Sequence, residues 1–210
     1  IFFFKVYHSM ELNFLHEALD FVKNASCEDR VSRQNKSTDL LFDPWGIKEN
    51  SEKIEKDTHY LSLRKILSPE TPIFSLSPVQ ESIYHGDSGT AFVPGLIKKT
   101  FLHLKSRFVV RPLSLEDLKN LVKYAWDNHL HYSIRGSGTW PFGGCVPMNQ
   151  DIVIDLSYLD FYHLYPEQKC LTIGPGVLFK DMRSFLRDHD FALETDITNP
   201  GSGTICGWIA

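Results

Sequence analysis

The stretch Ile134–Pro147, IRGSGTWPFGGCVP, holds four glycines, two prolines and a single charged residue, Arg135. Ordering it is costly, because glycine loses more backbone freedom on folding than any other residue. Glycine also leaves backbone N–H groups bare, and a concave run of such groups binds anions such as a pyrophosphate. The stretch is therefore either a plain surface loop or a loop whose backbone lies against a ligand. Its glycine spacing alone favours the surface loop.

Short apolar runs flank this stretch on both sides. They predict strands over residues 107–112, 131–134 and 151–156, the second of which leads directly into the glycines. Two further runs separated by Pro166–Lys169 predict a hairpin over residues 161–174. The glycine stretch thus connects two predicted strands.

Two segments have apolar residues at helical spacing. The first spans residues 114–128, with Ser114 as the expected N-cap and Asp117 completing a capping-box pattern. The second spans residues 178–190. The order of strands and helices predicts an α+β or mixed α/β unit and not a regular Rossmann alternation.

The first hundred residues give weaker signals. A helix is predicted over residues 11–24, and a polar stretch follows over residues 28–57. Prolines then argue against long regular elements up to about residue 95. We therefore predict a partly helical, irregular N-terminal extension over residues 1–104 and a domain over residues 105–210.

Composition narrows the class of protein. The 210 residues are 42% hydrophobic and 23% charged, which is enough to build a core of normal size. The formal net charge of −4 gives no general attraction to nucleic acid. No apolar run approaches the ~20 residues that a membrane-spanning helix needs. We expect a cytoplasmic protein, and leave open a homodimer and a peripheral contact with a membrane.

Cysteine and histidine spacing predicts no metal site. The four cysteines, Cys27, Cys145, Cys170 and Cys206, form no C-x-x-C pair, and we expect them to be reduced. His129 and His131 share a face of a possible strand, but no third ligand is nearby.

Two more segments combine glycines with small residues. LTIGPGVLFKDM (residues 171–182) places Gly174 and Gly176 around a proline, and by itself it predicts a tight strand-to-helix turn. TNPGSGTICGWIA (residues 198–210) by itself predicts a loop entering a strand or helix. Because this apolar segment ends at Ala210, we expect the sequence to be part of a longer domain.

Together these segments are far more specific than any one of them. The combination comprises FVVRPLSLEDLKNLVKYA, RGSGTWPFGGCVP, IVIDLSYLD, IGPGVLFKDM and NPGSGTICGWIA, with YHGDSG (residues 84–89) upstream. It resembles the FAD-binding domain of the vanillyl-alcohol-oxidase and p-cresol-methylhydroxylase (PCMH) superfamily. Within that superfamily it is most similar to FAD-linked D-lactate and 2-hydroxyacid dehydrogenases and to alkyl-dihydroxyacetonephosphate synthases.

The resemblance implies a PCMH-type α+β fold that holds an extended FAD, with the first subdomain and the start of the second in residues 105–210. It implies that residues 135–139 cradle the pyrophosphate and that residues 200–209 line the adenine-diphosphate or flavin side. The implied FAD-binding residues are Arg135, Gly136, Ser137, Gly138, Thr139, Gly143, Gly144, Gly176, Pro200, Gly201, Ser202, Thr204, Gly207 and Ile209.

Three positions depart from the family pattern. Members that bind FAD covalently often have histidine where this chain has Thr139, so we predict non-covalent FAD. Asn199 replaces the usual aspartate. Cys206 replaces a glycine, and we expect its side chain to crowd a close backbone approach.

The resemblance implies an FAD-dependent oxidoreductase, or the N-terminal part of one, that oxidises a 2-hydroxy acid such as D-lactate by hydride transfer to flavin N5. The catalytic residues and the electron acceptor are not identified. Two alternatives stay open: an FAD- or nucleotide-binding module without redox activity, and a flavoenzyme of the alkyl-dihydroxyacetonephosphate-synthase type.

Overall fold

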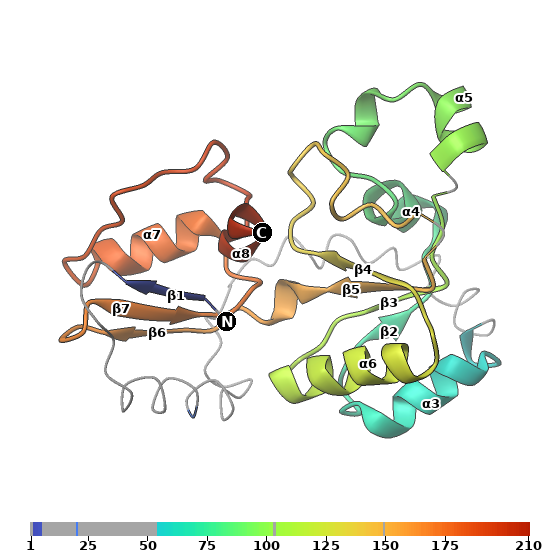
Figure 1. Cartoon of the computed structure of the whole chain (residues 1–210), viewed down its shortest axis with the longest axis horizontal. Coiled ribbons are helices and arrows are strands. Elements are labelled where there is room, and N and C mark those ends of the chain that lie inside the picture. The colour runs from blue at the N-terminus through green and yellow to red at the C-terminus, as the bar shows by residue number, and fades with distance from the viewer. Residues whose placement is uncertain (1, 6–19, 21–53, 103, 149) are drawn as a thin grey trace.

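The computed structural model describes residues 2–5, 20, 54–102, 104–148 and 150–210, which form two sheets with helices packed against each (Figure 1). The helix predicted over residues 11–24 lies outside this part of the chain, apart from Asp20. The predicted α+β class is confirmed, because short strands and helices mix without a regular alternation.

The first sheet has four strands in the order β2-β3-β5-β4. Strands β3 (Phe108–Val110), β5 (Ile152–Asp155) and β4 (Tyr132–Arg135) run parallel, and β2 (Ile73–Phe74) pairs antiparallel at the edge. These three parallel strands confirm the strands predicted over residues 107–112, 131–134 and 151–156.

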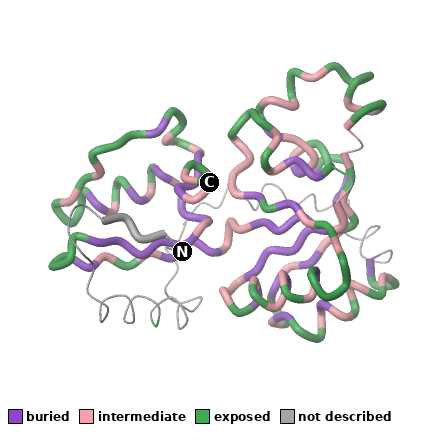
Figure 2. The backbone as a smooth tube through the Cα atoms, viewed as in Figure 1, coloured by how far each residue is buried: buried purple, intermediate pink, exposed green. Residues whose placement is uncertain are grey.

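Successive strand residues point to opposite faces of this sheet, and residues on both faces are buried. Phe108, Val110 and Ile152 pack against α3 (Thr58–Ile66) and α6 (Leu115–Asp127). Val109 and Val153 pack on the other face against Tyr84 of α4 (Pro78–Tyr84). The central strands are therefore buried throughout, as Figure 2 shows.

Helix α6 begins as predicted, with the Ser114 side chain accepting a hydrogen bond from Asp117 N. The predicted capping box is wrong, however. The Asp117 carboxylate is buried, with 3% of the residue exposed. It accepts hydrogen bonds from Ser68 and Thr71 and not from the backbone at the start of α6. It therefore joins α6 to the loop that follows α3.

Residues 54–102 are part of the same folded unit. They supply β2, α3 and α4, and then η3 (Thr90–Phe92), α5 (Gly95–Ile97) and η4 (Lys98–Leu102). The division at residue 104 stays a prediction, but the residues before it complete the sheet and core that the residues after it begin.

The second sheet has the antiparallel order β1-β7-β6. The predicted hairpin is confirmed as β6 (Tyr162–Tyr165) and β7 (Cys170–Ile173), and β1 (Phe2–Lys5) pairs with the other edge of β7. Leu171 and Ile173 pack against Met182 and Leu186 of α7 (Phe179–Arg187), the second predicted helix.

Two short helices complete the described chain. A 3-10 turn, η5 (Leu156–Tyr158), leads from the first sheet toward the second, and α8 (Ile205–Ile209) lies near the end. Within the described ranges, no helix has both the length and the apolar character needed to cross a bilayer.

Candidate functional site

The predicted glycine loop lies at the carboxyl edge of the parallel strands. It begins directly after Arg135, the last residue of β4, while Arg111 follows β3 and Asp155 ends β5. In open sheets with parallel strands, ligands bind outside this edge. The topology thus places the glycines where such a sheet accepts a ligand.

A buried polar network stabilises this edge. Arg111 Nε donates to Asp155 Oδ2 at 2.8 Å, and Tyr84 OH donates to the same oxygen at 2.6 Å. Arg111 Nη2 also donates to Tyr84 OH at 2.5 Å. Burial raises the pKa of Tyr84 well above its ordinary value, and Asp155 raises it further, so the phenol stays protonated. The network connects β3, β5 and α4 beneath the loop.

The side chain of Arg135 is turned into the fold. Its guanidinium donates to Gly86 O at 2.8 Å and to Cys145 Sγ at 3.4 Å, and it lies over the Tyr84 ring. The Arg135 side chain therefore joins the start of the loop to Gly86 and Cys145. A direct contact of Arg135 with FAD stays a prediction.

Residues 137–139 leave their backbone donors available. In the part of the chain that the structure describes, no hydrogen bond is made by the backbone N–H groups of Ser137, Gly138 or Thr139. The side chains of Ser137 and Thr139 pair with each other, with 3.3 Å between their oxygens. Consecutive free N–H groups are the arrangement that binds a phosphate.

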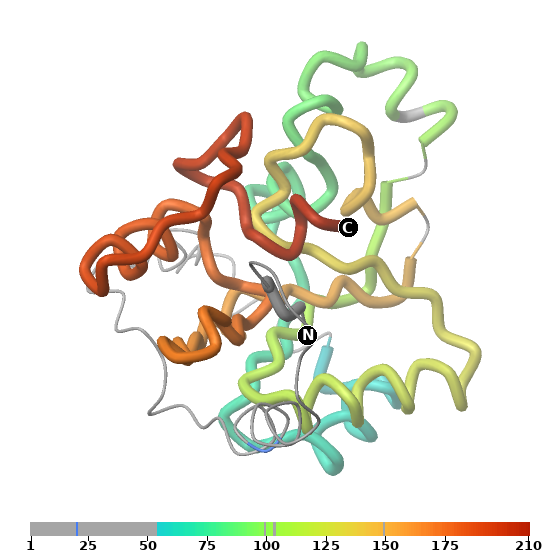
Figure 3. Tube along the Cα trace, turned by 60° about the vertical axis from the view of Figure 1, so that its left-hand side comes forward, coloured from blue at the N-terminus to red at the C-terminus, as the bar shows by residue number. Residues whose placement is uncertain are grey.

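The three glycine segments meet at Thr204. A Cβ on Gly136 would lie 2.5 Å from Thr204 Oγ1, and Thr204 forms a β-bridge with Leu178, two residues after Gly176. Gly203 O also accepts a hydrogen bond from Phe179 N. Figures 1 and 3 both place the end of the chain beside the loop that follows β4. Segments far apart in the sequence therefore form one region.

Four of the predicted glycines lie in close contact with other parts of the chain. A Cβ at Gly136 or Gly207 would lie within 2.8 Å of Thr204 Oγ1, and one at Gly176 would lie 2.3 Å from Leu156 O. A Cβ at Gly138 would lie 2.2 Å from the Arg135 guanidinium, and its φ of +67° also favours glycine.

The other three have open space where a side chain would be. Nothing lies within 4 Å of a Cβ built on Gly143, Gly144 or Gly201. Gly143 needs glycine for its φ of +80°, but neither packing nor a positive φ requires glycine at Gly144 or Gly201. Bare backbone beside open space leaves room for a ligand to approach the main chain, and contact of these three glycines with the diphosphate of FAD stays a prediction.

The remaining predicted residues lie around the start of α7 and within α8. Pro200 O accepts from Lys180 N, which covers the beginning of α7, and Ser202 Oγ donates to Asn199 Oδ1 at 3.0 Å. Gly207 N donates to the side chain of Thr204, the N-cap residue of α8. Ile209 packs against the core formed by the second sheet and α7, which we call the second unit.

The Cys206 side chain also packs into this core. Its sulfur lies 4.0 Å from Gly174 O, and burial raises the pKa of the thiol to about 11. The crowding expected at this position is thus directed toward the interior of the second unit.

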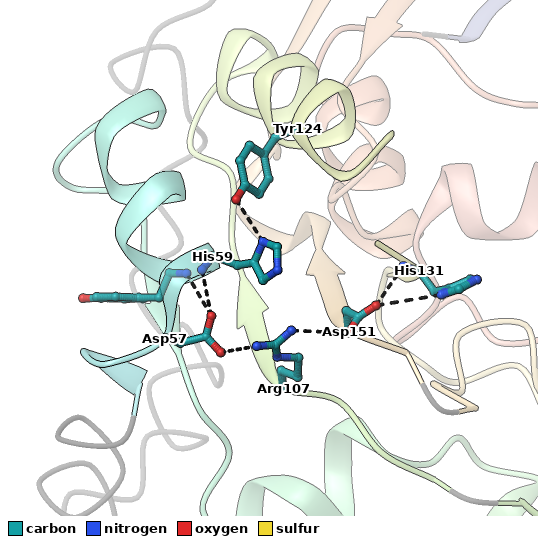
Figure 4. A network of polar contacts seen from close by, with 7 residues as sticks. Asp57, His59, Arg107, Tyr124, His131 and Asp151 are labelled. Atoms are coloured by element: carbon teal, nitrogen blue, oxygen red, sulfur yellow. Dashed lines mark hydrogen bonds and ion pairs between the residues drawn. The ribbon is translucent and has the colours of Figure 1, made fainter. Parts of the chain in front are cut away.

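A second polar network lies at the amino ends of the parallel strands, opposite the carboxyl ends that the glycine loop follows (Figure 4). Arg107, just before β3, lies 2.6 Å from Asp57 and 3.7 Å from Asp151, and Asp151 accepts from His131 N at 3.1 Å. His59 Nδ1 and Tyr124 OH are 2.9 Å apart. These residues surround the amino ends of the strands, so they connect elements of the fold and lie away from the glycine loop.

No cluster of three metal-ligating side chains forms among the described residues. His131 Nδ1 lies 3.8 Å from Asp151 Oδ2. His129 lies in the turn after α6, where its backbone has a φ of +54°.

Comparison with known proteins identifies this region. Residues 106–210, half of the chain, match the family described as an FAD binding domain. The chain belongs to this family. FAD is accordingly the cofactor that this fold holds, and the predicted PCMH-type fold is confirmed.

Three similar proteins illustrate the family. The (R)-6-hydroxynicotine oxidase of Paenarthrobacter nicotinovorans is 33% identical over 51% of this chain and 23% of its own length. A Schizosaccharomyces pombe protein named as a mitochondrial D-lactate dehydrogenase is 24% identical over 50% and 20%. The solved structure of an alkyldihydroxyacetonephosphate synthase is 18% identical over 71% and 30%, with a TM-score of 0.60. The chain thus spans less than a third of each of these proteins.

Sequence patterns did not reveal the roles of three residues at the carboxyl ends of the parallel strands, beside the glycine loop. Asp155 ends the apolar strand β5, Arg111 directly follows the apolar strand β3, and Asp87 lies in the YHGDSG segment. A charged residue at the carboxyl end of an otherwise apolar strand is the signal that could have identified the first two.

Proposed function

We propose that this chain is the FAD-binding part of an FAD-dependent oxidoreductase that oxidises a 2-hydroxy acid such as D-lactate. The convergence of the three glycine segments at Thr204 carries the proposal, together with the free N–H groups of Ser137–Thr139. A relative named as a D-lactate dehydrogenase supports the substrate class.

In this proposal the chain binds and orients FAD. The N–H groups of Ser137, Gly138 and Thr139 bind the diphosphate, and the bare backbone of Gly144 and Gly201 lets it approach. The fourteen residues implied by the resemblance remain the proposed FAD-binding set. When bound, FAD supplies an acceptor for the hydride of the substrate Cα–H, and the protein contributes position and electrostatics.

Flavin binding is the first test. The purified protein is expected to become yellow when FAD is added and to show flavin absorbance after gel filtration. Because Thr139 offers no histidine for attachment, we propose that FAD is held non-covalently, so acid precipitation is expected to leave all flavin in the supernatant. Flavin that stays with the precipitate would contradict the non-covalent part, and a colourless protein would contradict the whole.

Substrate oxidation is the second test. With FAD bound and air excluded, D-lactate is expected to bleach the flavin absorbance, and L-lactate serves as the matched control. Equal bleaching by both, or by neither, would remove D-lactate as the substrate.

An FAD-binding module without redox activity is the second candidate. The matched family is described as an FAD binding domain, which names a cofactor and no reaction. FAD binding without bleaching by any 2-hydroxy acid would support it. An activity of the alkyl-dihydroxyacetonephosphate-synthase type rests on likeness of fold alone. The cytoplasmic location, the homodimer and the electron acceptor remain predictions or open questions.

A further inference from the structure

Residues 86–89, which precede the matched domain, lie against the glycine loop. Gly86 O accepts from Arg135 Nη1 at 2.8 Å. Gly143 N donates to Asp87 Oδ2 at 2.7 Å. Both ends of the loop are therefore held by one short segment.

Two further contacts hold the middle of the loop. Ser88 Oγ donates to Thr139 O at 2.7 Å. A Cβ on Gly89 would lie 2.0 Å from Pro141 O, so the two backbones are in direct contact there. Residues 86–89 thus contact the loop at four successive points between Arg135 and Gly143.

Asp87 is itself firmly held. It is 8% exposed, its Oδ1 accepts from Thr90 N at 2.7 Å, and its own N–H donates to Thr90 Oγ1 at 2.7 Å. Burial raises the pKa of this carboxyl, but the N–H groups of Thr90 and Gly143 lower it more, so the charged form is favoured. Hydrogen bonds to an ionised acceptor are about twice as strong as neutral ones.

This arrangement matters because glycine-rich backbone is costly to order. Fixing the backbone of a residue costs conformational entropy, and a ligand that must order a loop on binding loses affinity by that amount. A loop already held at Arg135, Thr139 and Gly143 presents its free N–H groups without that cost.

We propose that Asp87 is a positioning residue for FAD. Asp87 acts through Gly143, and Ser88 acts through Thr139, so that together they hold residues 137–139 in place for the diphosphate. The inference rests on the proposed diphosphate site. It adds residues outside the matched domain that determine FAD affinity without touching FAD.

The main test compares Asp87→Asn with Asp117→Asn. Thr90 N and Gly143 N donate to different oxygens of Asp87, and asparagine replaces one of these oxygens with an NH2 group that cannot accept. Asp117 is a matched control, because its buried carboxylate also joins two segments, Ser68 and Thr71 to α6, away from the loop. Both variants are expected to lower the Tm. Only Asp87→Asn is expected to raise the Kd for FAD, by about tenfold, measured by titration well below the Tm.

A milder pair keeps the test valid where Asp87→Asn fails to fold. Ser88→Ala removes an exposed serine-to-carbonyl hydrogen bond to the loop, and Ser82→Ala removes one of the same length, 2.7 Å, to Val79 O within α4. Ser88→Ala is expected to raise the Kd for FAD about threefold, and Ser82→Ala to leave it unchanged. Amide exchange over residues 136–144 without FAD is expected to speed up in Asp87→Asn and Ser88→Ala only.

The outcomes separate this inference from the proposed function. If the unmodified protein binds FAD and both loop variants bind it equally well, the inference is overturned and the proposed function stands. If the unmodified protein binds no FAD, both are overturned.

Discussion

Thr204 Oγ1 occupies the space that a side chain on Gly136 would need, because a Cβ there would lie 2.5 Å from that oxygen. Sixty-eight positions apart, the two residues join the loop after the first sheet to the N-cap of α8. This contact brings the second unit against the glycine loop, and the site depends on it.

Gly136→Ala is expected to push Thr204 away and to destabilise the protein by about 1–3 kcal/mol, as overpacking does in tight contacts. Urea denaturation measures the loss. Thr204→Ser in the same background keeps the oxygen and is expected to rescue nothing. A variant Gly136→Ala with unchanged stability would show that the contact is loose.

Gly144→Ala is expected to behave in the opposite way. Nothing lies within 4 Å of its Cβ position, so stability without FAD is expected to stay equal or rise by up to about 1 kcal/mol. FAD affinity is expected to fall about tenfold, because the methyl group faces the approaching ligand. Gly95→Ala in α5 also meets open space and is the control that leaves the Kd for FAD unchanged.

Asp155→Asn is expected to destabilise the protein by about 3–5 kcal/mol, since it removes the charge that faces a buried guanidinium. Arg111 is 1% exposed and Asp155 is 4% exposed. Tyr84→Phe removes only a hydroxyl from the same network and is expected to cost about 1 kcal/mol. Equal losses in the two variants would argue against an ion pair at the centre of the network.

Stability is expected to fall in alkali through Tyr84. Its pKa in the folded protein is raised above the unfolded value of 10.0, by burial first and Asp155 second. The protonated phenol therefore stabilises the fold fully below pH 10, and this contribution is lost as the pH rises above it. Urea denaturation between pH 9 and pH 11 is expected to show a steeper decline in the unmodified protein than in Tyr84→Phe.

Arg107→Ala is expected to leave FAD affinity unchanged, because Arg107 lies at the opposite edge of the sheet. Its side chain is 39% exposed, so the stability loss is expected to be about 1 kcal/mol or less. A fall in FAD affinity would show that the two edges of the sheet are coupled.

Local sequence was sufficient for the regular elements near the glycines. The apolar runs of β3, β5 and the hairpin, and the spacing and N-cap of α6, are local properties, and each predicted the element that forms. The contribution of residues 54–102 was missed, because β2 has only two residues and its role comes from pairing with β3.

The sequence by itself determined the family and the need for glycine-rich backbone, since motif spacing and residue type are read along the chain. Only the tertiary structure decided which glycines serve packing, at Gly136 and Gly176, and which face open space, at Gly144 and Gly201. The tertiary structure also decided that the Arg135 side chain donates to Gly86 O and that Asp87 accepts from Gly143 N. The physical reason is that such roles depend on atoms tens of residues away, which no local pattern contains.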